Sequence, residues 1–136
     1  MKTGLFVILT LLSLSAQGAL VVIGHPDNDA TLDKETLQRL YTGRSNSLLN
    51  GDAAIPLNLS DQQSLRSQFD EKALGRSSSQ LKAFWSKLVF TGKGTPPKEV
   101  DSETEMITLI SSTPNLIGYV SANTDTAGVK VLMSIE

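Results

Sequence analysis

The chain has 136 residues, 12 Lys and Arg against 14 Asp and Glu, one histidine, no cysteine and 40% hydrophobic residues. These values fit one globular domain or two very small ones, and they exclude a disordered or fibrous chain. Without cysteine there are no disulfides or thiolate sites, one histidine excludes a poly-histidine metal site, and the net charge of −2 favours neither nucleic acid nor anionic lipid.

Residues 1–19 have the three parts of a secretory signal peptide. Lys2 makes the start positive, residues 5–14 form an uncharged apolar run, and small residues follow. The apolar run is shorter than the roughly 20 residues of a membrane span, although an uncleaved N-terminal anchor is the alternative. Cleavage after Ala16, Gly18 or Ala19 fits the pattern. We therefore expect a periplasmic or secreted domain over residues 20–136, with no membrane span after cleavage.

Strand and helix patterns alternate along this domain. Residues 20–23 form a β-branched apolar run that predicts a buried strand ending in a turn. Asp33 predicts the cap of a helix that ends at Gly43, and residues 55–59 alternate like a second strand. Residues 116–120 and 129–135 predict the closing strands. The pattern indicates an α/β domain without internal repeats or a second domain.

Three later helices are predicted to begin at capping boxes, in which a serine is followed three residues later by Gln or Glu. These pairs are Ser60 with Gln63, Ser77 with Gln80, and Ser102 with Glu105. Each precedes apolar residues at helical spacing, which predicts a helix that buries one face.

The strand–turn–helix segment at residues 58–66 is the first candidate binding site. A helix start presents free backbone N–H groups and a positive dipole end, and Ser60, Ser64 and Arg66 could add hydroxyls and a forked cation for an anion. The alternative is that Ser60 and Gln63 only cap the helix, while Arg66 is a solvated surface charge. Asp61 favours this alternative, because its carboxylate already occupies the positive helix end.

The turn after the first strand is the second candidate, because ligands of open α/β sheets bind outside the carboxyl ends of strands. His25 and Asn28 can donate and accept hydrogen bonds there. The alternative is an ordinary polar turn. No second histidine and no cysteine supports a metal ion, so we expect neither a metal nor a cofactor.

Three other patterns indicate structural roles. Residues 91–95 contain glycines and a lysine but lack the spacing of a phosphate loop, which predicts a connecting loop. Phe84 and Trp85 fall at helical spacing with other apolar residues and predict core positions. The acidic run at 99–105 indicates a helix cap and a solvated face. Because no nucleophile–base pair is identifiable, we expect a protein that is not an enzyme.

Several segments, in this order, resemble phosphate ABC transporter substrate-binding proteins. Residues 36–44, 50–52 and 55–58 are similar to the helix–Gly–loop–strand unit of that family, and residues 64–69 to the stretch after its phosphate-binding serine. The last similar segment, Thr-Pro-Asn-Leu-Ile-Gly-Tyr-Val at 113–120, resembles its near-C-terminal strand. The middle region also fits, at 84–85, 91–94 and 96–97.

This resemblance implies an α/β fold of the periplasmic-binding-protein type 2 lobe, with a mixed sheet and flanking helices. The family holds phosphate between two lobes and passes it to a membrane permease, whereas the length here implies a reduced form with about one lobe. The family's Ser-Gly-Thr-Arg motif corresponds to Gln63-Ser64-Leu65-Arg66, so only Arg66 matches directly. The family's early Gly/Ser-rich loop is replaced by residues 25–28.

We therefore expect a periplasmic protein that binds phosphate or a related small anion for ABC transport. The binding residues expected are His25, Asn28, Ser60, Ser64 and Arg66. An ABC permease, another envelope protein or a second copy of the chain is the partner expected, and nucleic acid is not. The alternative is an accessory or protein-interaction domain that kept the fold and lost the ligand, as the replaced motif indicates.

Overall fold

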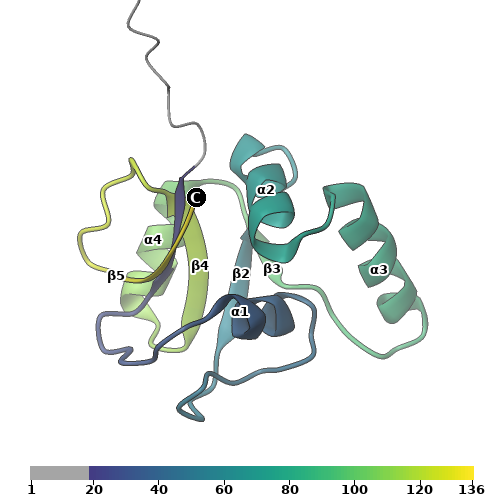
Figure 1. The fold of residues 1–136 in the computed structure, drawn as a ribbon, viewed down its shortest axis with the longest axis horizontal. Helices are drawn as coiled ribbons and strands as arrows, with labels where there is room; N and C mark the ends of the chain where they lie inside the picture. Colours follow the sequence, from purple (N-terminus) through teal and green to yellow (C-terminus); the bar gives the residue numbers. More distant parts are fainter. Residues whose placement is uncertain (1–18) are drawn as a thin grey trace, which may run out of the picture.

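The computed structural model describes residues 19–136, which form a five-stranded mixed sheet with helices on both faces (Figure 1). The strands are β1 (Leu20–Gly24), β2 (Ile55–Leu59), β3 (Lys98–Val100), β4 (Leu116–Ser121) and β5 (Lys130–Ile135). The helices are α1 (Lys34–Tyr41), α2 (Ser64–Phe69), the π-helical turn η1 (Asp70–Leu74), α3 (Ser78–Phe90) and α4 (Glu103–Ser112). The predicted α/β class with a mixed sheet is confirmed.

The strand directions determine which loops can meet. In the sheet order β3-β2-β4-β1-β5, β2 is parallel to β3 and β4, whereas β1 is antiparallel to β4 and β5. Gly24 at the end of β1 pairs with Ile117, which also pairs with Pro56 near the start of β2. The end of β1 and the end of β2 therefore lie at opposite edges of the sheet.

Alternate residues of β4 face two different helix layers. A Cβ added to Gly118 would collide with Met106 Sδ and would lie 2.8 Å from Ile110 Cδ1, so a glycine is what allows α4 to approach this closely. Tyr119 points to the opposite face, where its ring stacks on Phe69 with a centroid distance of 3.8 Å. The Ile-Gly-Tyr-Val segment thus joins a helix contact on one face to an aromatic cluster on the other.

The aromatic cluster lies between the sheet and the α1–α2 layer. The Tyr41 ring meets Phe69 edge-on at 4.8 Å, and its hydroxyl donates to Leu57 O at 2.7 Å. The Tyr119 hydroxyl donates to Asn58 Oδ1. Burial raises the pKa of both tyrosines, so the phenols remain protonated donors. The buried hydroxyls are therefore hydrogen-bonded, as a stable core requires.

Most of the predicted helix starts are confirmed. Asp33 accepts from Thr36 N at 2.7 Å, and Ser102 accepts from Glu105 N at 3.1 Å. Ser77 and Gln80 form a complete capping box at the start of α3. These local hydrogen bonds satisfy backbone donors that a helix start leaves free.

The capping box predicted at Ser60 and Gln63 is wrong. α2 begins at Ser64, and the side chain of Gln63 makes no cap hydrogen bond. Its Nε2 instead donates to Asp101 O at 2.7 Å, while Ser60 N continues the sheet by donating to Val100 O at 2.9 Å. Contacts with β3 and the loop after it, distant in sequence, therefore displace the local capping pattern.

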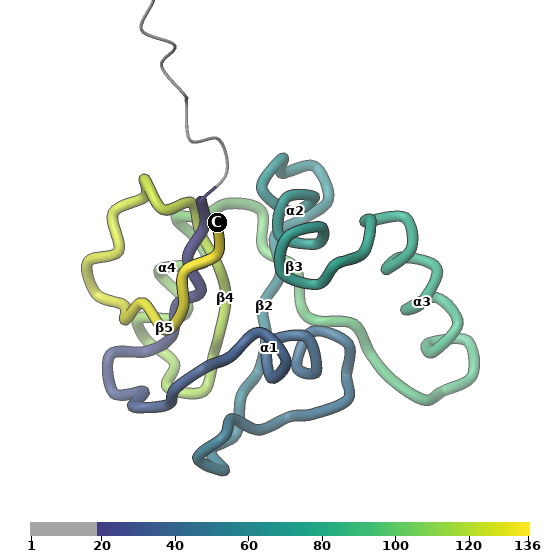
Figure 2. Tube along the Cα trace, in the orientation of Figure 1, coloured from purple at the N-terminus to yellow at the C-terminus, as the bar shows by residue number. Residues whose placement is uncertain are grey.

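Helix α3 lies beside the sheet rather than over it, as Figures 1 and 2 both show. Trp85 is buried against the chain that follows α1, where a Cβ on Gly43 would lie 2.9 Å from its ring and the positive φ of 73° also favours glycine. Phe84 is only half-buried, so its predicted core position is wrong, because α3 packs on the domain through one narrow face. Phe90 is 91% exposed.

The signal peptide predicted for residues 1–19 lies, apart from Ala19, outside the described residues. Within residues 19–136, no helix has the length and apolar character needed to cross a bilayer.

Candidate functional site

Arg66 is fixed at the end of β2 by three acceptors. Its Nη1 donates to the backbone carbonyl of Leu59 at 2.7 Å and to Glu99 Oε1 at 3.1 Å, and its Nε donates to Asp70 Oδ2 at 3.2 Å. The side chain is only 12% exposed. Burial alone would lower the pKa of Arg66, but Asp70 and Glu99 raise it above its usual range, so the cation persists.

Asp70 is the buried partner of this arginine. Its side chain is fully buried, and Oδ2 also accepts from the Ser78 hydroxyl at 2.6 Å. The other oxygen, Oδ1, is buried without a hydrogen-bond partner in the described part of the chain. Burial raises the pKa of Asp70, although Ser78 and Arg66 oppose this effect. The pair is therefore a low-dielectric contact that holds the guanidinium in one place.

Arg66 lines a cavity of about 270 Å³, which we call the α2–α3 cleft. Part of its lining is Asp61, Arg66 and Glu99, and the rest comes from α3; the α3 residues are Ser78, Ser79, Lys82 and Trp85. Lys82 Nζ lies 4.0 Å from Asp61 Oδ2, and both side chains are mostly exposed. The lining thus combines two cations, two carboxylates and two hydroxyls, which is a polar but electrically balanced site.

The two predicted serines near Arg66 do not line this cleft. Ser60 uses its backbone, since its N donates to Val100 O and its carbonyl accepts from Gln63 N at 3.0 Å. Ser64 is exposed at the start of the six-residue α2, and its carbonyl accepts from the Ser67 hydroxyl. Of the three binding residues expected within 58–66, which are Ser60, Ser64 and Arg66, Arg66 alone lines the cavity.

His25 and Asn28 lie at the other edge of the sheet. They follow the end of β1, which is level with Pro56, whereas Arg66 approaches the end of β2, roughly 10 Å further along the strand at 3.3 Å per residue. His25 Nδ1 accepts from Asp27 N at 3.1 Å, and Asn28 Oδ1 accepts from Ala30 N at 3.0 Å. The structure therefore does not bring the two predicted halves of the site together, and here the side chains stabilise a turn.

The cleft residues that sequence reasoning missed come from α3 and β3. Ser78, Ser79 and Lys82 follow the correctly predicted cap at Ser77, and the run of three serines was a signal that pointed only to capping. Glu99 lies in a three-residue strand without an apolar pattern. Among the described residues, no cluster of His, Asp and Glu could hold a metal ion.

No protein-family model and no curated protein matches the sequence. Solved structures do match. An ABC-type phosphate transport receptor from Vibrio cholerae has a TM-score of 0.65 and 18% identity over 84% of this chain and 45% of its own. A phosphate ABC transporter substrate-binding protein with bound phosphate from Clostridium perfringens has a TM-score of 0.65 and 19% identity, covering 84% and 44% of the two chains.

PstS from Borrelia burgdorferi is a third neighbour, with a TM-score of 0.55 and 18% identity over 76% of this chain and 44% of its own. The chain spans less than half the length of these proteins, and identity this low shows the fold alone. The resemblance drawn from the sequence is confirmed at that level: the chain has the fold of about half of a phosphate ABC transporter substrate-binding protein.

Proposed function

We propose that this chain is a periplasmic substrate-binding-like domain that binds phosphate or a related small oxyanion in the α2–α3 cleft. The observation that carries the proposal is the guanidinium of Arg66, held by Leu59 and Asp70 in a cleft that the Ser79 hydroxyl and the Lys82 ammonium of α3 also line. A fixed guanidinium provides a charged donor for an oxyanion, and the Ser79 hydroxyl and the Lys82 ammonium add further donors. The phosphate-transport neighbours support this ligand class.

Glu99 is the group that the anion would displace. Its side chain is 52% exposed, so its ion pair with Arg66 is screened by solvent and is weaker than the buried pair with Asp70. When a ligand enters, Arg66 keeps its contacts with Leu59 and Asp70 and turns one donor to the anion. Transport would follow if the loaded domain delivers the anion to an ABC permease.

The carboxylates around the cleft give the proposal a selectivity. Glu99 and Asp61 can accept a hydrogen bond from an oxyanion that carries a proton, such as hydrogen phosphate, but they repel an anion without a proton, such as sulfate. We therefore expect phosphate to bind more tightly than sulfate at neutral pH.

The test is calorimetric titration of the purified protein with inorganic phosphate and with sulfate. We expect Arg66→Gln to weaken phosphate binding at least about tenfold, because it removes a charge-assisted contact. Lys87→Gln is the matched control, since Lys87 is an exposed cation of α3 outside the cleft and should leave affinity within about twofold. No heat with millimolar phosphate, or equal losses in both variants, contradicts the proposal.

An accessory or interaction domain is the second candidate function. The observation that favours it is the charge balance of the α2–α3 cleft, where Arg66 already contacts two carboxylates. Under this alternative, the protein binds no phosphate and associates with an envelope protein or a second copy of itself. Light scattering and capture from periplasmic extract test it, and a monomer without partners that binds phosphate rejects it.

A further inference from the structure

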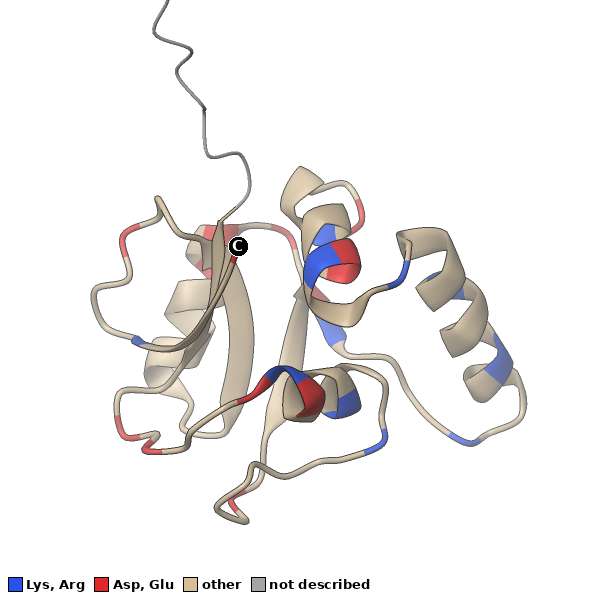
Figure 3. Cartoon of the chain, viewed as in Figure 1, with Lys and Arg blue, Asp and Glu red and all other residues tan. Residues whose placement is uncertain are grey.

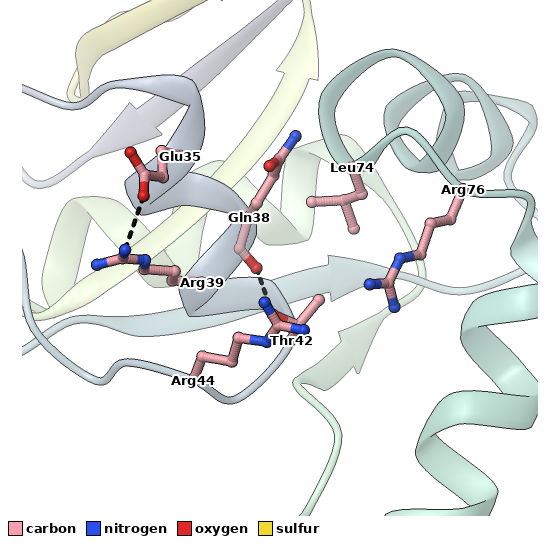
Figure 4. Close-up of a pocket in the computed structure, with 7 residues that line it drawn as sticks. All are labelled: Glu35, Gln38, Arg39, Thr42, Arg44, Leu74 and Arg76. Atoms are coloured by element: carbon pink, nitrogen blue, oxygen red, sulfur yellow. Dashed lines mark hydrogen bonds and ion pairs between the residues drawn. The ribbon is translucent and has the colours of Figure 1, made fainter.

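A second cavity, of about 260 Å³, lies between α1 and the segment that joins η1 to α3 (Figure 4). Three of its lining residues are arginines and one is a glutamate, and we call it the arginine cavity. Its lining consists of Glu35, Gln38, Arg39, Thr42, Arg44, Leu74 and Arg76. None of these residues lines the α2–α3 cleft, so the two cavities are separate.

The three arginines differ in their partners. Arg39 Nη2 donates to Glu35 Oε1 at 2.7 Å, and Figure 4 shows its guanidinium turned toward that carboxylate. Arg44 and Arg76 make no ion pair with a carboxylate within residues 19–136. Figure 4 shows their side chains extending toward each other from opposite walls. Two uncompensated cations thus face the same space.

The backbone holds both arginines in position. Arg44 N donates to Arg39 O at 2.9 Å just after α1, and Arg76 N donates to Asp70 O at 3.2 Å at the end of η1. The Arg76 guanidinium also lies over the Phe84 ring, 5.4 Å from its centroid. The backbone bonds fix where both side chains begin, and the ring contact restricts the Arg76 guanidinium before any ligand arrives, which reduces the entropy that this side chain loses on binding.

The dipole of α1 does not explain this arrangement by itself. Cations near a helix C-terminus are favourable, which accounts for Arg39 and Arg44. Arg76 belongs to a different segment, and placing it opposite Arg44 brings like charges together, which is unfavourable without an anion between them. Negative charge in the cavity would relieve this repulsion.

The charge distribution of the whole domain supports an anionic ligand here. Residues 34–98 contain 10 Lys and Arg against 5 Asp and Glu, whereas residues 19–33 and 99–136 contain one against nine. Figure 3 shows basic residues on α1, the loop after it, α2 and α3, with some acidic residues on α1 and beside α2, and mainly acidic residues around β1, α4 and β5. The positive half of this field attracts anions to the face that carries the arginine cavity.

We infer that the arginine cavity binds a small phosphoryl anion with two or more negative charges, a diphosphate or a phosphomonoester, between Arg44 and Arg76. Guanidinium groups match phosphoryl oxygens with paired donors. The cavity volume is just below the range of small-molecule sites, which favours a compact anion over a larger organic ligand. This inference is independent of the function proposed for the α2–α3 cleft.

The test is titration with inorganic pyrophosphate at low salt, using Arg44→Gln, Arg76→Gln and the double variant. We expect each single variant to weaken binding about fivefold and the double variant at least about twentyfold. The double variant Lys87→Gln/Lys93→Gln is the matched control, because it removes the same charge from exposed positions outside both cavities. We expect that control to change affinity less than about twofold.

Arg66→Gln distinguishes this site from the α2–α3 cleft. It should retain a pyrophosphate site that is lost in the Arg44/Arg76 double variant, and a loss in Arg66→Gln as large as that of the double variant overturns the inference. Equal weakening by the Lys87/Lys93 control also overturns it.

Vesicles of phosphatidylcholine with phosphatidic acid form a second arm, since that headgroup is a phosphomonoester. Binding to vesicles that depends on Arg44 and Arg76 assigns the phosphoryl group to a lipid, and pyrophosphate binding alone assigns it to a soluble ligand. Binding to neither at millimolar phosphoryl groups overturns the inference.

Discussion

The α2–α3 cleft and the arginine cavity are both lined by arginine, but they differ in how far its charge is paired with carboxylates. Arg66 is 12% exposed and contacts two carboxylates and a carbonyl, whereas Arg44 is exposed and Arg76 half-buried, with no carboxylate partner in the described chain. The difference shows that the charge of an arginine in a cavity can be compensated or free. An anion has to displace Glu99 to reach Arg66, whereas no carboxylate of residues 19–136 has to be displaced at Arg44 and Arg76.

The comparison predicts that Asp70, the buried carboxylate paired with Arg66, contributes strongly to the stability of the fold. Asp70→Ala should lower the free energy of unfolding by about 4 kcal/mol, because it leaves Arg66 without its buried counter-charge. Urea denaturation measures this value. Asp29→Ala is the control, since Asp29 is 92% exposed in a surface ion pair and should change stability by less than about 0.5 kcal/mol. Similar losses in both variants would show that the buried pair has no special weight.

Replacing the arginines themselves sharpens the contrast. Arg66→Met should cost about 3 kcal/mol, because Asp70 remains buried with only the Ser78 hydroxyl as a partner. Arg44→Met should change the free energy of unfolding by less than about 0.5 kcal/mol, since its guanidinium is exposed and unpaired. Thermal and urea unfolding of the two variants test this. A costly Arg44 substitution would mean that the arginine cavity is also part of the core.

Removing the Ser78 hydroxyl, which donates to Asp70, should have a smaller effect on the free energy of unfolding. Ser78→Ala removes a 2.6 Å charge-assisted hydrogen bond to Asp70 and should cost about 1.5 kcal/mol. Ser79→Ala is the matched control, because the neighbouring side chain is exposed. Urea unfolding of the two variants gives the comparison, and an equal cost would deny Ser78 its role in holding the carboxylate.

The smallest expected effect is a pH dependence that belongs to Asp70 alone. Its folded pKa lies above the ordinary value of 3.8, so the folded state binds more protons than the unfolded state between these two values. The contribution of Asp70 to stability should therefore increase as pH falls from 7 through the folded pKa toward 4. The difference in unfolding free energy between the native protein and Asp70→Asn measures it. A difference that shrinks on acidification would reverse the sign of the shift.

The sequence predicts features whose hydrogen bonds or packing are local. Asp33, Ser77 and Ser102 each cap a helix within three or four residues, and the alternating residues of β4 set its two faces. The same reasoning failed at Gln63, whose partner, the carbonyl of Asp101, is 38 residues away. Local patterns cannot reveal such a partner, because the fold brings it close only after the sheet has formed.

The candidate sites depended more strongly on long-range geometry. Arg66 was identified from its position after a strand, but its pairing with Glu99 crosses 33 residues. Arg44 and Arg76 belong to separate segments and carry no joint motif. Whether His25 lies near Arg66 depends on the direction of β1 relative to β2. The two strands run in opposite directions because β1 is antiparallel and β2 parallel to β4. Strand direction is a property of the assembled sheet rather than of either strand.

Trp85 gives the protein an optical reporter at its most loosely attached helix. It is the only tryptophan in the chain, it lines the α2–α3 cleft, and its ring packs against Gly43 and Gly94. Movement of α3 away from the sheet would hydrate this indole and shift its emission to the red while the five strands remained paired. Intrinsic fluorescence can therefore follow the docking of α3 separately from global unfolding, in the unlabelled protein.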